Sequence, residues 1–136
     1  MAVQARDLTT PIDSAGWSEG SVWVIHYVRT KPGRFVDYVK EFRDTTVRYL
    51  NVLKADGRVL SHKLLRNDFP RQAEWDVIHL VEYKDKAALD QSVKYQESVV
   101  KRVWGTIRDA STSEVSREEL REECGSILLT ELLVEP

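Results

Sequence analysis

Two kinds of hydrophobic periodicity alternate along the chain. Stretches rich in β-branched and aromatic residues predict four strands. They cover residues 22–29, 58–66, 74–83 and 127–134. After the Lys31-Pro32-Gly33 break, apolar side chains recur every three or four residues from Phe35 to Leu53. This spacing predicts an amphipathic helix that ends at Ala55-Asp56-Gly57.

A second helix is predicted after the third strand. Asp85 is a suitable N-cap, and helical apolar spacing continues from Leu89 to Ile107. Ser116 and Glu119 form a capping-box pattern, which predicts a short third helix over residues 116–124 that ends at Gly125. Residues 1–20 lack periodicity and are predicted to form an irregular N-terminal arm, while residues 21–136 form a single domain.

The element order is therefore β-α-β-β-α-(short α)-β. It predicts an α+β, ferredoxin-like fold with a four-stranded antiparallel sheet and two helices on one face. The other face is also rich in Val, Ile, Leu and aromatic residues. Because an apolar sheet face needs a cover, we expect a second copy of the chain to pack against it as a homodimer.

Composition excludes several classes of protein. The formal net charge is -2, with 20 Lys and Arg against 22 Asp and Glu, so we expect no nucleic-acid partner. No apolar run approaches the ~18 residues of a membrane span. Cys124 is the only cysteine, which excludes an internal disulfide or a cysteine metal cluster. The chain has neither a dinucleotide-binding nor a P-loop glycine motif, and we expect no cofactor.

The sequence favours a cytoplasmic location, because no signal peptide is present as written. A periplasmic location is the alternative. Residues 2–5 (AVQA) have the small-residue pattern of a cleavage site, which would suit an export signal that has been removed.

The chain resembles the dimeric α+β barrel superfamily over about residues 21–134. The resemblance rests on the element order, on residues 30–33 (TKPG) before the first helix, and on residues 81–85 (VEYKD) after the third strand. The superfamily includes antibiotic-biosynthesis-type monooxygenases, haem-degrading monooxygenases, polyketide cyclases and stress-responsive barrel proteins. The resemblance implies the fold and a homodimer, whereas function depends on the site that the fold carries.

This chain has different residues at several positions where members of the superfamily have functional residues. Aligned with the haem-degrading members, His26 replaces an asparagine, Tyr83 a tryptophan and Arg102 the haem-ligating histidine. No histidine follows Asp85, so the resemblance does not extend to haem ligation. The tyrosine and histidine of the plant-type polyketide cyclases correspond to Ser92 and Ser98.

Strand alternation predicts a small-molecule site. Side chains two residues apart share one face of a strand, so Val24 accompanies His26, and Trp75, Val77 and His79 accompany Tyr83. If both sets face the barrel interior, they form an apolar pocket with a few polar groups, as is typical of a ligand site. We expect a small apolar or aromatic ligand. The candidate catalytic residues are His26, His79 and Tyr83, and the candidate ligand-binding residues are Val24, Trp75, Val77, His62 and Trp104.

The candidate chemistry is proton transfer. A neutral imidazole can take a proton from a phenol or an acidic C–H, and Tyr83 can donate to the resulting oxyanion. In the cofactor-free oxygenases that the resemblance suggests, the carbanion then reacts with oxygen. The predicted function is a cofactor-independent monooxygenase, cyclase or isomerase on a small aromatic or polyketide-like substrate. The alternative is a non-catalytic ligand-binding or stress-associated barrel.

Structural interpretations stay open for several of these residues. Trp75 and Tyr83 could fill the dimer core, His62 could face the dimer seam, and Trp104 could be core packing. The three histidines lie on separate strands without a local ligand motif, so we expect no metal site. Residues 117–123 have the charge spacing of a solvated helix face and receive no function.

Overall fold

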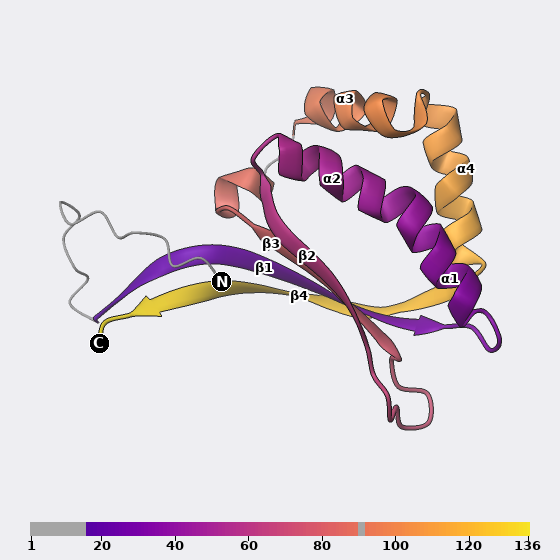
Figure 1. Cartoon of the computed structure of the whole chain (residues 1–136), viewed down its shortest axis with the longest axis horizontal. Helices are drawn as coiled ribbons and strands as arrows, with labels where there is room; N and C mark the ends of the chain where they lie inside the picture. The colour runs from indigo at the N-terminus through magenta and orange to yellow at the C-terminus, as the bar shows by residue number, and fades with distance from the viewer. Residues whose placement is uncertain (1–15, 90–91) are drawn as a thin grey trace.

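A computed structural model describes residues 16–89 and 92–136 (Figure 1). The first half contains β1 (Trp17–Thr30), α1 (Phe35–Glu41), a π-helical turn (Phe42–Thr46), α2 (Val47–Ala55) and β2 (Val59–Arg66). The second half contains β3 (Val77–Tyr83), a 3-10 turn (Lys86–Leu89), α3 (Val93–Trp104), α4 (Ile107–Glu118) and β4 (Arg121–Val134). None of the helices in this part of the chain has the length and apolar character of a membrane span.

The four strands form one antiparallel sheet in the order β2-β3-β1-β4. The α+β, ferredoxin-like arrangement predicted from the sequence is confirmed, and β1 pairs with β3. In this pairing His26 lies directly opposite His79. Strand β1 is thus central, and its side chains can join a site with residues from two neighbouring strands.

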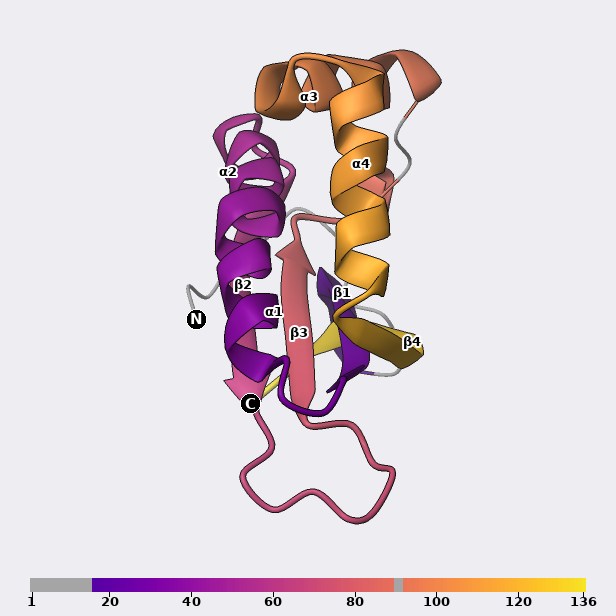
Figure 2. The same ribbon diagram turned by 90° about the vertical axis from the view of Figure 1, so that its right-hand side faces the viewer.

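All helices lie on one face of the sheet (Figure 1). Seen from the end, α1 and α2 form a continuous helix on the side of β2, and α4 lies beside it on the side of β4 (Figure 2). Buried residues from the sheet and the helices form two core clusters, one around Leu53 and Val99 and one around Tyr38 and Val28. The helix-facing side of β1 and β3 is therefore covered by the chain's own helices.

The predicted second helix is divided in three. Residues 86–89 form a 3-10 turn, and α3 then begins behind Ser92, whose Oγ accepts from the backbone N–H of Tyr95 at 3.1 Å. Gly105, with a φ of 82°, ends α3, and Thr106 caps α4. Because glycine adopts positive φ without strain, the chain turns at this point and the apolar spacing continues on a separate helix.

A helix was predicted over residues 116–124. The prediction is correct for residues 116–118 and wrong for the rest. Helix α4 ends at Glu118, and Arg121 already pairs with Thr30 in the sheet. Gly125 lies opposite Tyr27 within β4 and is not a helix cap. Pairing with the central strand β1 satisfies the backbone of this segment, so tertiary structure overrides the local capping pattern.

Strand β1 begins earlier than predicted. Residues 17–20, which were expected to belong to the irregular arm, are part of β1, and residues 17–19 pair with the end of β4. The two strands form a ribbon that extends beyond the helices (Figure 1). The remainder of the expected arm, residues 1–15, lies outside the described residues.

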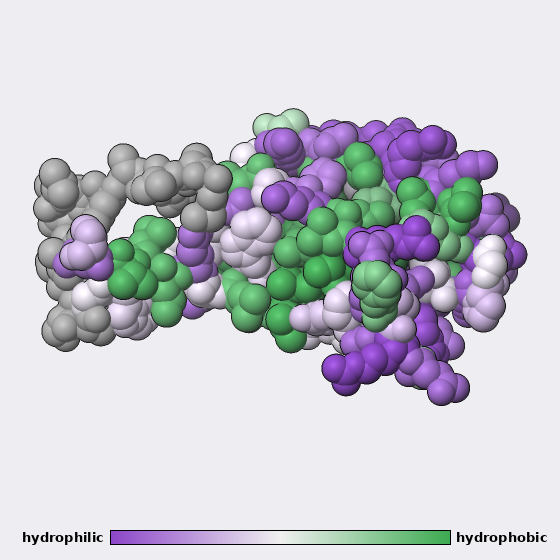
Figure 3. Space-filling model, turned by 60° about the horizontal axis from the view of Figure 1, so that its bottom comes forward, coloured by the Kyte–Doolittle hydropathy of each residue, from purple (hydrophilic) through white to green (hydrophobic). Residues whose placement is uncertain are grey.

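An apolar patch occupies the face of the sheet opposite the helices (Figure 3). We call this side the open face. By strand alternation and register its apolar side chains are Trp23, Ile25, Tyr27, Leu65, Ile78, Leu80, Ile127 and Leu129. The side chains of Leu65, Ile127 and Leu129 are exposed in the single chain. An apolar surface that joins several strands in this way is typical of an interaction surface.

Leu53 should be among the most costly residues to truncate. Its side chain is 0% exposed and packs in the core cluster between α2, α3 and the sheet. Leu53→Ala should lower the free energy of unfolding by about 2–5 kcal/mol, because it removes buried methyl groups and leaves a cavity. Urea unfolding measures this. Leu60→Ala, at an exposed position, is the control and should cost clearly less; equal costs would contradict the assigned core.

Candidate functional site

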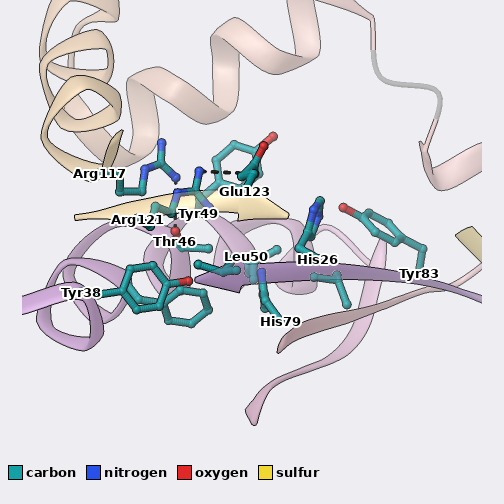
Figure 4. Close-up of a pocket in the computed structure, with 13 residues that line it drawn as sticks. His26, Tyr38, Thr46, Tyr49, Leu50, His79, Tyr83, Arg117, Arg121 and Glu123 are labelled. Carbon is teal, nitrogen blue, oxygen red and sulfur yellow. Dashed lines mark hydrogen bonds and ion pairs between the residues drawn. The ribbon is translucent and has the colours of Figure 1, made fainter. Parts of the chain in front are cut away.

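A cavity of about 240 Å3 lies between the sheet and the helices. Its floor comes from β1, β3 and the start of β4, one wall from the α1–α2 helix and the other from α4 (Figure 4). The residues lining it are His26, Val28, Tyr38, Phe42, Thr46, Tyr49, Leu50, His79, Val81, Tyr83, Arg117, Arg121 and Glu123. An engineered apolar cavity of about 150 Å3 admits benzene, so this one has room for a ligand of one or two rings.

The location corrects one expectation. Strand alternation predicts that these side chains line a lumen shared with a second sheet. In the structure the same strand faces lie under the chain's own helices, where Val28 and Val77 pack against Tyr38 and Phe42. The pocket therefore belongs to a single chain. The helices occupy this face because their apolar stripe matches the valine-rich side of the strands.

His26 and His79 form a pair in the middle of the cavity floor. Their ring centroids lie 5.8 Å apart with an interplanar angle of 25°. The ring of Phe42 stands edge-on to His79, with the centroids 4.7 Å apart. Phe42 belongs to the π-helical turn, which locally widens the α1–α2 helix beside the site; such turns are frequent at functional sites.

Both imidazoles are neutral at pH 7. Burial, followed by the neighbouring His26 and His62 and by Arg121, lowers the pKa of His79 to about 3. Burial also lowers the pKa of His26, but the nearby Glu123 carboxylate opposes that shift. His79 is 8% exposed, and its Nε2 has no hydrogen-bond partner among the described residues. His79 is a buried polar group, whereas half-buried His26 is the more basic of the two.

Two tyrosines add hydroxyl groups to the lining. Burial raises the pKa of Tyr83, with a further contribution from Tyr49, and burial raises the pKa of Tyr49 as well. Both phenols are therefore protonated at neutral pH, and each retains its O–H as a hydrogen-bond donor. The Tyr49 ring is backed by Trp104 at a centroid distance of 6.2 Å.

Arg117 and Arg121 line the other end of the cavity (Figure 4). Arg117 donates through Nη1 to Thr46 Oγ1 at 3.3 Å. Arg121 lies 3.4 Å from a carboxylate oxygen of Glu123 and hydrogen-bonds Tyr38. The Nε atoms of both arginines are buried and have no hydrogen-bond partner among the described residues.

These arginines were missed by the sequence analysis, which assigned residues 117–123 to a solvated helix face. The helix ends at Glu118, so Arg121 lies on β4 beside the cavity. A β-bulge at Cys124 shifts the register between Tyr27 and Val28, which places Glu123 opposite Val28 on the cavity side. The sequence contained no local signal for the bulge or for the change from helix to strand.

Of the predicted site residues, His26, His79 and Tyr83 line the cavity together. The five predicted ligand-binding residues lie outside this lining. Val77 is 1% exposed and belongs to the core. Trp104 packs against the ring of Tyr49 but does not itself line the cavity. Val24 lies between Val81 and Leu128 on neighbouring strands.

Trp75 and His62 depart from the predicted site for different reasons. Trp75 precedes β3, so strand alternation does not extend to it, and its ring contacts Tyr27 of the open face at 5.3 Å. His62 pairs with Val81 and faces the helices, not a dimer seam. It nevertheless does not line the cavity, which makes it a suitable control for the other two histidines.

Two observations bear on a metal or haem site. Among residues 16–89 and 92–136, no group of three His, Cys, Asp or Glu side chains is placed to hold a metal ion. Arg102, which aligns with the haem-ligating histidine of the haem-degrading proteins, pairs with Asp56 at 2.8 Å on the surface. The side chains that line the cavity carry imidazole, phenol, guanidinium, hydroxyl and carboxylate groups.

The neutral, buried His79 makes stability depend on pH. Its folded-state pKa of about 3 lies below the ordinary value of 6.5, so the unfolded chain binds the extra proton first as pH falls. Stability is thus fully present above pH 6.5 and is lost towards pH 3. Between pH 6 and pH 4 the free energy of unfolding should fall by roughly 1 kcal/mol per pH unit more in the wild type than in His79→Gln. Urea unfolding at a series of pH values measures both slopes; parallel slopes would contradict the assignment.

Comparisons with known proteins establish the fold. No protein-family model matches the sequence, and no curated protein matches it significantly. Solved structures do match. SnoaB from Streptomyces nogalater, a cofactor-independent oxygenase, is 14% identical, with 82% of this chain and 93% of SnoaB covered and a TM-score of 0.50. A dimeric ferredoxin-like protein from an uncultured marine organism is 10% identical, with 88% and 91% covered and a TM-score of 0.51. The chain thus shares its α+β, ferredoxin-like fold with these proteins.

Proposed function

We propose that this protein is an enzyme that removes a proton from a small phenolic or otherwise acidic aromatic substrate. The observation that carries the proposal is the pair of neutral histidines in a partly apolar cavity of about 240 Å3. A neutral imidazole is a competent base near neutral pH, and the aromatic and aliphatic side chains of the lining favour an aromatic ligand. The substrate anion formed in this way is stabilised by the ring and by hydroxyl donors.

His26 is assigned as the base, and His79 as a neutral partner that contacts the ligand. A base works best when its pKa lies near the working pH. His79, with a pKa of about 3, is too weak a base, whereas the lowering of the His26 pKa by burial is partly offset by Glu123. Once His26 carries the proton, the same carboxylate stabilises the imidazolium. Tyr83 is assigned as the donor to the substrate oxyanion.

Oxygenation is the reaction that we favour after the proton transfer. An activated CH2 group that loses a proton can react with O2, which leaves a carbonyl in the product and one molecule of water. SnoaB shares the fold and is described as a cofactor-independent oxygenase, so the scaffold is compatible with such chemistry. Because fold does not imply function, the proposal rests on the cavity.

A homodimer is part of the proposal. The open face carries an apolar patch that crosses several strands (Figure 3), and pairing of two such faces around a two-fold axis would remove it from water. The ferredoxin-like protein of similar fold is described as dimeric. The cavity lies on the opposite side of the sheet, so each chain would carry a complete site.

Isotope exchange tests the proton transfer without knowledge of the natural product. Naphthalene-1,3-diol carries an acidic ring C–H between its two oxygens, and its exchange in D2O under anaerobic conditions can be followed by NMR. The wild type should accelerate the exchange over buffer, and Thr46→Trp, which fills the cavity, should remove the acceleration. If the folded wild type binds the diol but does not accelerate its exchange, the proposal of an enzyme is wrong. The protein is then a non-catalytic ligand-binding barrel.

A further inference from the structure

The cavity has a distinct basic end. Arg117 and Arg121 reach it from the end of α4 and the start of β4 (Figure 4). Their outer nitrogens are held by Thr46, Glu118 and Glu123 at 3.3–3.4 Å. Their Nε–H groups remain buried and unpaired among the described residues. A buried donor without an acceptor costs about 1–3 kcal/mol, so an acceptor supplied by a ligand would be bound favourably here.

The charges on the lining also favour an anion. Two guanidinium groups face one carboxylate, that of Glu123, while both histidines are neutral. Glu118 pairs with Arg121 but is largely exposed and does not line the cavity. The lining therefore has a net charge of +1 within a chain whose formal net charge is -2. A single negative charge on the ligand would balance it.

The strand register gives the spacing between the two ends. Arg121 lies opposite Thr30, and His26 lies four residues before Thr30 on the same face of β1. The two backbone positions are thus about 13 Å apart along the sheet. One or two aromatic rings, together with their substituents, have a length of this order. A ligand of that length would touch the arginines and the histidine pair at once.

We infer that the substrate is an aromatic carboxylate of one or two fused rings. Its carboxylate binds Arg117 and Arg121, and its acidic O–H or C–H, at the far side of the ring system, lies at His26. This inference rests on the proposed function and names the substrate class of that site. Guanidinium N–H groups and carboxylate oxygens match in geometry and charge. A neutral ligand of the same shape would leave the arginine charges unbalanced.

Matched ligands test this class of substrate. 6-Hydroxy-2-naphthoate and its amide, 6-hydroxy-2-naphthamide, differ at the carboxylate alone. Isothermal titration at pH 7.5 should show that the wild type binds the acid at least tenfold more tightly than the amide. Arg117→Met should bring the two affinities together, and Arg117→Lys should keep part of the preference. Arg108→Met, at an exposed position on the same helix, should leave the preference unchanged.

The outcomes separate this inference from the proposed function. Equal affinity of the wild type for the acid and the amide would overturn the carboxylate assignment while leaving an aromatic pocket in place. Failure of both ligands to bind would count against the pocket and so against both proposals. Because the comparison of the two ligands needs only the wild type, it remains decisive even if Arg117→Met fails to fold.

Discussion

His26→Ala should lower the rate of proton transfer from a bound phenolic substrate by roughly 10²–10⁴-fold, the usual contribution of a positioned general base. The imidazole of His26 is half-buried at the cavity floor and remains more basic than that of His79. Removing it leaves the cavity walls intact, so affinity for the substrate should change far less than the rate. Isotope exchange of naphthalene-1,3-diol in D2O provides the rate, and titration of the same diol provides the affinity.

His62→Ala is the matched control for this prediction. His62 lies on the same face of the same sheet, opposite Val81, and its pKa is also lowered by burial. It does not line the cavity, so its loss should leave the exchange rate within a few-fold of the wild type. If His26→Ala retained the full rate, or if His62→Ala lost as much, the assignment of His26 as the base would be wrong.

His79→Ala should behave differently from both. Its imidazole is neutral and contacts the ring of Phe42, which makes it part of the cavity wall and a hydrogen-bonding group for the ligand. Its loss enlarges the cavity beside His26 and removes a polar contact. The affinity for the diol should therefore fall together with the rate, and this combination distinguishes a group that positions the substrate from the base itself.

The sequence was sufficient for the fold and for part of the cavity lining. Strand alternation alone placed His26, His79 and Tyr83 on one side of the sheet, because side-chain direction in a strand is set by parity. It could not decide which layer covers that side. The valine-rich faces of β1 and β3 suit a helix layer as well as a second sheet, and only the packing of Tyr38 and Phe42 against Val28 and Val77 distinguishes them.

The basic end of the cavity could not be predicted for a different reason. Residues 117–123 contain alternating charges that fit a solvated helix by every local criterion. The chain instead leaves the helix after Glu118 and enters the sheet at Arg121. The decisive interactions are backbone pairs with Thr30 and Val28, about 90 residues earlier. Local sequence patterns do not reveal contacts of this kind. The two arginines were therefore expected on the surface, whereas they line the cavity.

The position of the cavity determines how site and dimer are related. If the site were a lumen between two sheets, separation of the subunits would destroy it. In the structure the cavity lies between the sheet and the helices, and the open face lies on the other side of the sheet. Strand β1 contributes to both sides, with His26 towards the cavity and Ile25 towards the open face. We therefore expect dimer formation to stabilise the sheet that forms the cavity floor, without adding residues to the cavity.

Leu129→Glu should therefore convert the proposed dimer to a monomer that still binds its ligand. Leu129 is 46% exposed in the single chain and lies opposite Trp23 on the open face. Two-fold pairing brings two such glutamates into one apolar interface, and burial of an unpaired charge costs several kcal/mol. The dissociation constant should rise at least 100-fold in sedimentation experiments. Val115→Glu, with the same change at a 62% exposed position on α4, is the control. A dimer that survives Leu129→Glu would contradict the assigned interface, and a folded monomer that no longer binds naphthalene-1,3-diol would contradict a site within one chain.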